Sequence, residues 1–194
     1  MTRSRWALRQ CEAAAARARA ELRADLDATI PVGAAHAFLA RIIADHAGTG
    51  LSSEARRMGI PQPTQHSRWA RAGCPPFVRV RDTVRAHLLA ACLQDEAIPV
   101  AVAALEIGEC SSQHLARALL RATGQTPAQW RRSVTPTKTR HAWRRLLTEA
   151  GPAFRALALR VRITTPRDLQ ALRRAELLAL RELERVREAL ESVA

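Results

Sequence analysis

The clearest structural pattern in this chain lies at residues 99–132, which read PVAVAALEIGECSSQHLARALLRATGQTPAQWRR. Apolar residues three and four positions apart predict two short helices. The first begins at Pro99 and ends at Gly108, because glycine tolerates the positive φ that commonly follows a helix. Ser111 can cap the second helix, which is expected to end at Gly124. Two short helices around a glycine turn predict a helix-turn-helix.

The two apolar faces of this pattern are separate and well defined. The first helix would bury Val100, Ala103, Ala104 and Ile107, and the second would bury Leu115, Ala118, Leu119 and Ala122. In a DNA-binding helix-turn-helix, the second helix enters the major groove and its N-terminal residues reach the base edges. The outward residues here are Ser112, Gln113, Ala116, Arg117 and Arg121. Glutamine suits adenine edges and arginine suits guanine edges.

These residues carry a resemblance to a known family. The run LARALLRATGQTPAQWRR, which starts at Leu115, resembles the end of the AraC-type DNA-binding domain. The positions that fit the family pattern without a gap are Gly124, Thr126, Pro127, Trp130 and Arg131. The upstream stretch from Leu51 resembles the first helix-turn-helix and connecting helix of that domain, so the resemblance covers about residues 49–132.

The resemblance implies two helix-turn-helix units in one monomer, joined by a helix over residues 77–93. Such a helix would be about 25 Å long, and successive major grooves lie roughly 34 Å apart. By motif position, the base readers would be Pro63, His66 and Ser67 in the first unit and Ser112, Gln113, Ala116 and Arg117 in the second. The DNA-contacting residues predicted overall are Thr64, His66, Ser67, Arg68, Ser111, Ser112, Gln113, His114, Ala116, Arg117, Arg121, Arg131 and Arg132.

The first unit departs from the family pattern. Pro63 lacks a backbone donor, which a helix tolerates only near its start. Gln65 stands where the family has a buried leucine, and a buried amide without partners costs about 1–3 kcal/mol. In the second unit, Glu109 and Ala116 offer no strong base contact. We therefore expect the second unit to read bases and the first to hold phosphates.

The charge of the chain points to an anionic partner. The formal net charge is +13, and Lys138 is its only lysine. Residues 51–145 hold 15 basic and 6 acidic residues, a net of +9. Arginine binds phosphates and planar acceptors in a fork geometry. No segment is both strongly basic and strongly apolar, so a membrane surface is not expected.

The rest of the chain also predicts helices, and an all-α fold follows. Helices are expected at 3–26, at 34–47 and at 140–160, the last interrupted by Gly151-Pro152, with a polar linker before it at 133–139. A final helix begins at the cap Thr165 and runs to the C-terminus. The predicted division is an N-terminal extension (1–47), a tandem helix-turn-helix domain (48–133) and a C-terminal region (134–194). No β-rich effector domain fits these flanks.

No catalytic or metal-binding pattern stands out. The four cysteines form no CxxC pair and have no histidine at ligand spacing, so free thiols in a reducing cytosol are expected. There is no P-loop, GxGxxG motif or nucleophile elbow. Neither an enzyme nor a cofactor is predicted. Trp69 and Trp130 are expected to be core anchors.

Three functions remain open. The first is a cytoplasmic, nucleoid-associated bacterial transcription regulator that binds specific double-stranded DNA. The second is an architectural protein that binds DNA without sequence preference. The third is a protein-interaction scaffold with a degenerate helix-turn-helix. The C-terminal helix would pack within the chain, or join a homodimer or a partner protein.

Overall fold

The computed structural model describes residues 3–47, 49–108, 111–123 and 125–159, and these contain helices and no strand. The prediction of an all-α fold is confirmed. In chain order the helices are α1 (Arg3–Thr29), α2 (Ala34–Ala44), α3 (Leu51–Met58), α4 (Gln62–Arg71), α5 (Phe77–Leu93), α6 (Val100–Glu106), α7 (Ser112–Thr123), α8 (Pro127–Ser133) and α9 (Pro136–Leu159).

Three long helices, α1, α5 and α9, pack against one another and form the centre of the molecule. Small buried residues of α1, among them Cys11, Ala15 and Ala18, leave room for a neighbouring helix to approach closely. Trp143 of α9 is fully buried, and its indole Nε1 donates a hydrogen bond to the carbonyl of Leu22 at 3.1 Å. A buried indole needs such a partner, so this bond fixes α9 against α1.

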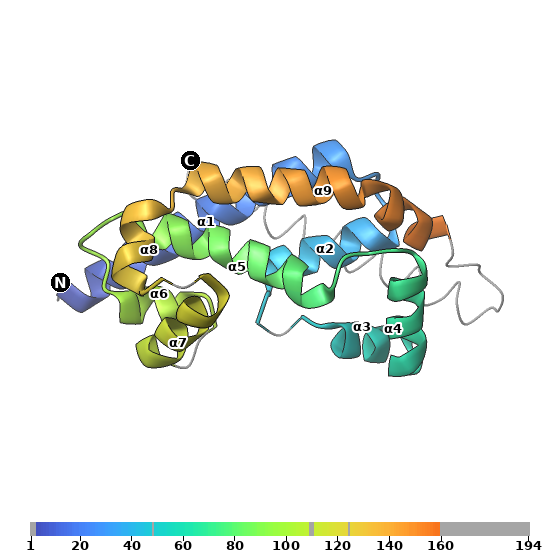
Figure 1. Cartoon of the computed structure of the whole chain (residues 1–194), viewed down its shortest axis with the longest axis horizontal. Helices are drawn as coiled ribbons and strands as arrows, with labels where there is room; N and C mark the ends of the chain where they lie inside the picture. Colours follow the sequence, from blue (N-terminus) through green and yellow to red (C-terminus); the bar gives the residue numbers. More distant parts are fainter. Residues whose placement is uncertain (1–2, 48, 109–110, 124, 160–194) are drawn as a thin grey trace.

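The two shorter helix pairs lie at opposite ends of α5. We call α3–α4 the first helix pair and α6–α7 the second helix pair. In Figure 1 both pairs lie on the side of α5 that faces away from α9, with the first pair at the right and the second at the left. The frame of α1, α5 and α9 therefore presents both pairs in the same direction.

One hydrophobic core draws on all three of the regions that the sequence divided. Leu22 comes from residues 1–47, Leu88 from residues 48–133 and Phe154 from residues 134–194, and all three are fully buried in it. The domain division stays a prediction, but α1, α2 and α9 share this core with the two helix pairs. The predicted C-terminal helix from Thr165 lies outside the described residues.

The start of α9 differs from the expected linker at 133–139. Only Val134 and Thr135 separate α8 from α9. The Thr135 hydroxyl accepts a hydrogen bond from the Lys138 amide at 3.3 Å, and Pro136 takes the first helical position. A threonine cap followed by proline is a strong helix start, so the linker prediction was wrong.

The expected interruption at Gly151-Pro152 was also wrong, because α9 continues through Pro152. The buried stripe of α9 continues across the proline with Ala150, Phe154 and Leu157. Packing of both halves against the core holds the helix together, although proline removes one backbone hydrogen bond. In Figure 1 the last turns of α9 bend away from its main axis, as expected beside a proline.

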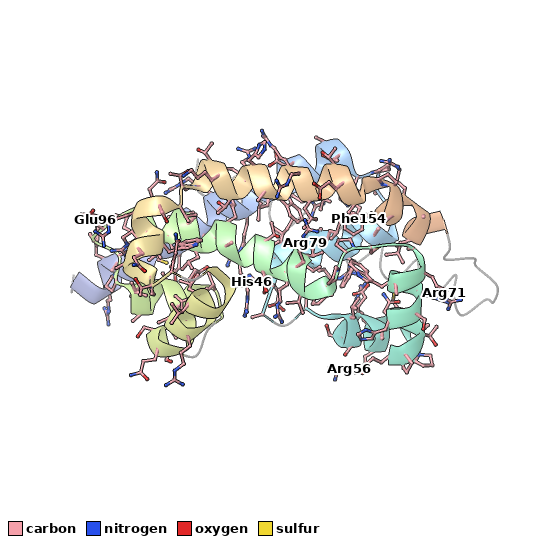
Figure 2. The ribbon with its side chains drawn as sticks, viewed as in Figure 1. His46, Arg56, Arg71, Arg79, Glu96 and Phe154 are labelled. Carbon is pink, nitrogen blue, oxygen red and sulfur yellow. The ribbon has the colours of Figure 1, made fainter. Side chains whose placement is uncertain are left out.

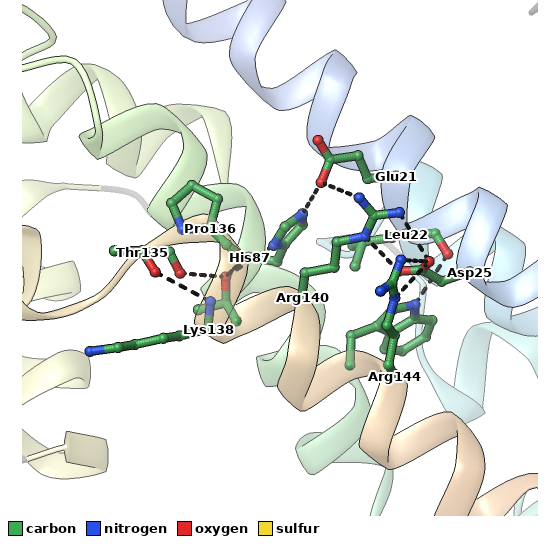
Figure 3. Close-up of polar contacts among 11 residues, drawn as sticks. Glu21, Leu22, Asp25, His87, Thr135, Pro136, Lys138, Arg140 and Arg144 are labelled. Carbon is green, nitrogen blue, oxygen red and sulfur yellow. Dashed lines mark hydrogen bonds and ion pairs between the residues drawn. The ribbon is translucent and has the colours of Figure 1, made fainter.

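An ion-pair cluster joins α1 to the first half of α9 (Figure 3). Asp25 is buried, and its carboxylate accepts hydrogen bonds from Arg140 at 2.8 and 3.0 Å and from Arg144 at 3.0 Å. Arg140 also donates to Glu21 at 3.2 Å. Burial acts to raise the pKa of Asp25, but the bonds from the two arginines outweigh it and the pKa is lowered. Arg144 is therefore part of the frame.

Cys11, Cys74 and Cys92 are free thiols, as predicted, and Cys110 lies outside the described residues. No helix in the described part of the chain is long and apolar enough to cross a membrane.

Candidate nucleic-acid interface

Two local features of the sequence set the start and the end of α3 in the first helix pair. At the start of α3 the Gly50 amide donates to the Ser53 hydroxyl at 2.7 Å, which satisfies a backbone group that the helix itself leaves open. Gly59 ends α3 at φ 66, a left-handed conformation that glycine adopts without strain. The chain then turns through Pro61, and α4 begins at Gln62 with Pro63 in its first turn. The proline therefore lies where its missing amide does least harm.

Trp69 fixes α4 to the rest of the molecule. Its ring lies edge-on to Phe38 and Phe77 and is tilted against Phe154, with centroid distances of 5.6, 6.3 and 5.8 Å. Its Nε1 donates to the carbonyl of Pro75 at 2.6 Å. The prediction that Trp69 is a core anchor is confirmed, since only 4% of the residue is exposed.

The burial of Trp69 determines which face of α4 is exposed to solvent. Gln65 lies four positions before Trp69 and is also buried, on the inward face as the family pattern implied. His66 and Ser67 are exposed, while Thr64 and Arg68 are half-buried. The first turns of α4 therefore present the predicted site residues outward, in a small polar cluster.

The acidic residue of the first helix pair is neutralised internally. Glu54 is buried, and its carboxylate pairs with Arg41 of α2 at 2.5 Å and with Arg57 at 2.6 Å. Arg56 and Arg71 remain exposed (Figure 2). Arg56 and Arg71 therefore place positive charge on the outer surface of this pair.

The second helix pair follows the sequence prediction closely where the structure describes it. Ala103 and Ala104 of α6 and the following cap residue Ile107 are buried, and Val100 packs partly against the core. Gly108 directly follows this cap residue and has φ 74. On α7, Leu115 and Leu119 face inward, while Gln113 and Arg117 are exposed and Ser112 and Ala116 are half-buried.

Three further predicted site residues lie on or next to α7. Ser111 is exposed and directly precedes the helix. His114 and Arg121 belong to α7, but their side chains lie outside what the structure describes, as do those of Ala118 and Ala122. The predicted outward cluster on α7 is therefore described at Ser111, Ser112, Gln113, Ala116 and Arg117.

Helix α8 follows the second helix pair and is locked by a reciprocal cap. The Thr126 amide donates to the Gln129 side chain at 2.8 Å, and the Gln129 amide donates to the Thr126 hydroxyl at 3.3 Å. Trp130 is buried, which confirms it as a core anchor. Arg132 is exposed, with its Nε directed to the carbonyl of Ala128 at 3.4 Å.

Arg131 has a structural role that the sequence did not reveal. Its guanidinium donates to the carbonyl of Ile98 at 2.6 Å and to that of Glu96 at 3.4 Å. These bonds hold α8 against the loop that precedes α6. A DNA contact by Arg131 stays a prediction, but its removal would disturb this loop as well.

A close contact beneath α5 joins the loop between α2 and α3 to the turn of the second helix pair. The loop between α2 and α3 brings Ala47 against Gly108, so closely that a Cβ added at Gly108 would lie 2.6 Å from the Ala47 Cβ. His46, labelled below α5 in Figure 2, is buried beside the backbone of Ile107. Burial lowers the pKa of His46, because the charged imidazolium is poorly solvated there. The turn of the second helix pair is therefore packed against the loop that leads into the first helix pair.

The described residues contain no group of His, Cys, Asp and Glu side chains suited to a metal ion. Comparisons of the chain with family models, with curated proteins and with solved structures gave no match. The AraC-type resemblance of residues 49–132 therefore stays a prediction.

Proposed function

We propose that this protein binds specific double-stranded DNA and regulates transcription, with each helix pair acting as a helix-turn-helix unit. The observation that carries the proposal is the position of the pairs at opposite ends of α5 and on the same side of it (Figure 1). Helix α5 has 17 residues and so spans about 25 Å. With a short helix projecting at each end, this frame suits two successive major grooves, which lie roughly 34 Å apart.

The side chains support unequal roles for the two pairs. Helix α7 presents Gln113 and Arg117 at its exposed N-terminal half, and these residue types pair with adenine and guanine edges. Helix α4 presents His66 and Ser67, with half-buried Arg68 beside them. Its short polar groups and nearby arginines suit phosphate contacts better than bidentate base recognition. The second pair reads the sequence and the first pair holds the duplex.

The test begins with selection of duplexes from a random pool, followed by binding measurements in excess random competitor. We expect a preferred site to survive the competitor. Gln113→Ala and Arg117→Ala should reduce the preference for that site, because a good bidentate base contact contributes about 1–3 kcal/mol of discrimination. Arg132→Ala should weaken all duplexes alike.

The matched control is Arg145→Ala, since Arg145 is exposed on α9 and its Nε lies 3.6 Å from the Glu149 carboxylate. This substitution removes the same charge far from both helix pairs and should change neither affinity nor preference. An unchanged preference in Arg117→Ala would exclude α7 as the reader. Binding that random competitor abolishes would favour an architectural protein, and no shift at low salt would favour a protein-interaction scaffold.

A further inference from the structure

A basic face of α5 lies between the two helix pairs and is not used by the base-reading residues. Arg81 and Arg85 are four positions apart on α5 and therefore lie on one face of that helix. The Arg85 guanidinium comes within 3.9 Å of a Cβ built at Gly108, the turn of the second helix pair. This face therefore turns toward the side on which the pairs lie.

Arg79 shows which side of α5 faces α9. Although it is only two positions from Arg81, its guanidinium pairs with Glu149 of α9 at 3.5 Å. Two positions on a helix differ by about 200° in direction. Arg79 therefore faces α9, and Arg81 faces the other way.

We propose that Arg81 and Arg85 contact the phosphates of the duplex segment that lies between the two major grooves held by α4 and α7. This inference rests on the proposed function and adds a third, sequence-independent contact to it. The Arg81 side chain is 33% exposed, Arg85 is half-buried, and the Nε atom of each is buried, so the fold fixes the stems of both side chains. An arginine held in this way loses less conformational entropy when it binds a phosphate.

Asp82 lies beside this pair and gives the proposal an independent test. Its carboxylate is 3.5 Å from the Arg81 Nε, and its side chain is 54% exposed. A carboxylate next to a phosphate-binding arginine opposes binding through charge repulsion and competes for the guanidinium. Removal of this charge should therefore strengthen binding if the face meets DNA.

The experiment measures duplex affinity against salt concentration for the full chain and four variants. The slope of log K against log salt falls by about 0.9 for each phosphate that the protein no longer neutralises. We expect the double variant Arg81→Ala/Arg85→Ala to reduce the slope by about 2 on every duplex sequence. Arg81→Lys/Arg85→Lys should retain most of the slope, because lysine keeps the charge. Asp82→Asn should raise affinity, and Arg79→Ala should leave slope and affinity unchanged.

The outcomes separate this inference from the proposed function. A wild-type protein that binds no duplex would overturn both. A wild-type protein that binds a preferred site, with a slope that Arg81→Ala/Arg85→Ala leaves unchanged, would overturn the α5 contact alone. If the alanine and the lysine double variants both lose binding, the two arginines act by maintaining the fold. This result would also overturn the α5 contact. Thermal unfolding of each variant is measured in parallel to identify that case.

Discussion

Substitution of Gly108 by alanine tests the contact between the turn of the second helix pair and the loop that leads into the first helix pair. Gly108 has φ 74, and its added Cβ would lie 2.6 Å from the Ala47 Cβ and 3.7 Å from the Ala47 Cα. The left-handed backbone costs an alanine roughly 1–2 kcal/mol. Forced overpacking costs about 1–3 kcal/mol more, because Ala47 must move with its loop. We expect Gly108→Ala to lower the free energy of unfolding by about 2–5 kcal/mol in total.

The matched control is Gly59→Ala. Gly59 has a similar φ of 66, and a Cβ there would meet no atom within 4 Å. This variant should therefore show the backbone cost alone, about 1–2 kcal/mol. The difference between the two glycine variants isolates the contact with Ala47.

A double-mutant cycle completes the test. Ala47→Gly removes the atom that an alanine at position 108 would strike, so the double variant should recover most of the overpacking cost. Unfolding in urea, with circular dichroism as the signal, gives the four free energies. Equal destabilisation by Gly108→Ala and Gly59→Ala, with no coupling to Ala47→Gly, would refute the close contact between Gly108 and the loop that leads into the first helix pair.

Two other predictions concern buried ionisable groups. Asp25→Asn should destabilise the protein by about 2 kcal/mol, because Arg140 and Arg144 lose a charged acceptor. As a control, Glu149→Gln removes the acidic partner of the exposed Arg145 and should cost at most about 1 kcal/mol. The folded-state pKa of Asp25 is lowered, so its contribution to the free energy of unfolding is present above the unfolded pKa of about 3.9 and is lost as pH falls further. The stability of Asp25→Asn, measured by urea unfolding, should therefore depend less on pH below about 4 than that of the wild type. An unchanged dependence on pH in this range would contradict the prediction. The folded-state pKa of His46 is also lowered, mainly by burial, so stability should fall as pH drops below the unfolded value of about 6.5. His46→Gln should reduce that slope between about pH 7 and pH 5, and a slope equal to that of the wild type would show that His46 is not buried as a neutral group.

The helix pairs could be predicted because their signals are local. Gly108 follows a short apolar pattern, and it has the positive φ that its position requires. Leu115 and Leu119 face inward for the same reason, since spacing of three and four residues defines a helix face. The expectation of a linker at 133–139 was wrong although Thr135-Pro136 is also a local signal, because the polar composition of the segment is equally typical of a linker.

The frame around the pairs could not be predicted from local patterns. Asp25 meets Arg140 across 115 positions of sequence, and no spacing rule connects them. The continuation of α9 through Pro152 depends on burial of Phe154 against helices from elsewhere in the chain. Its motif position predicts that Arg131 contacts DNA, and the structure shows in addition that two backbone carbonyls accept its hydrogen bonds. Such roles follow from tertiary packing, which a single sequence does not specify position by position.

The central claim is that the two helix pairs occupy successive major grooves of one duplex, and methylation interference at guanine N7 tests it most directly. N7 lies in the major groove, so methylation there blocks a helix that enters it. We predict two patches of interference, about 10 base pairs apart on one face of the selected duplex. Arg117→Ala should weaken the patch assigned to α7 and leave the other, and Arg145→Ala should preserve both. A single patch, or interference spread evenly along the duplex, would contradict the claim.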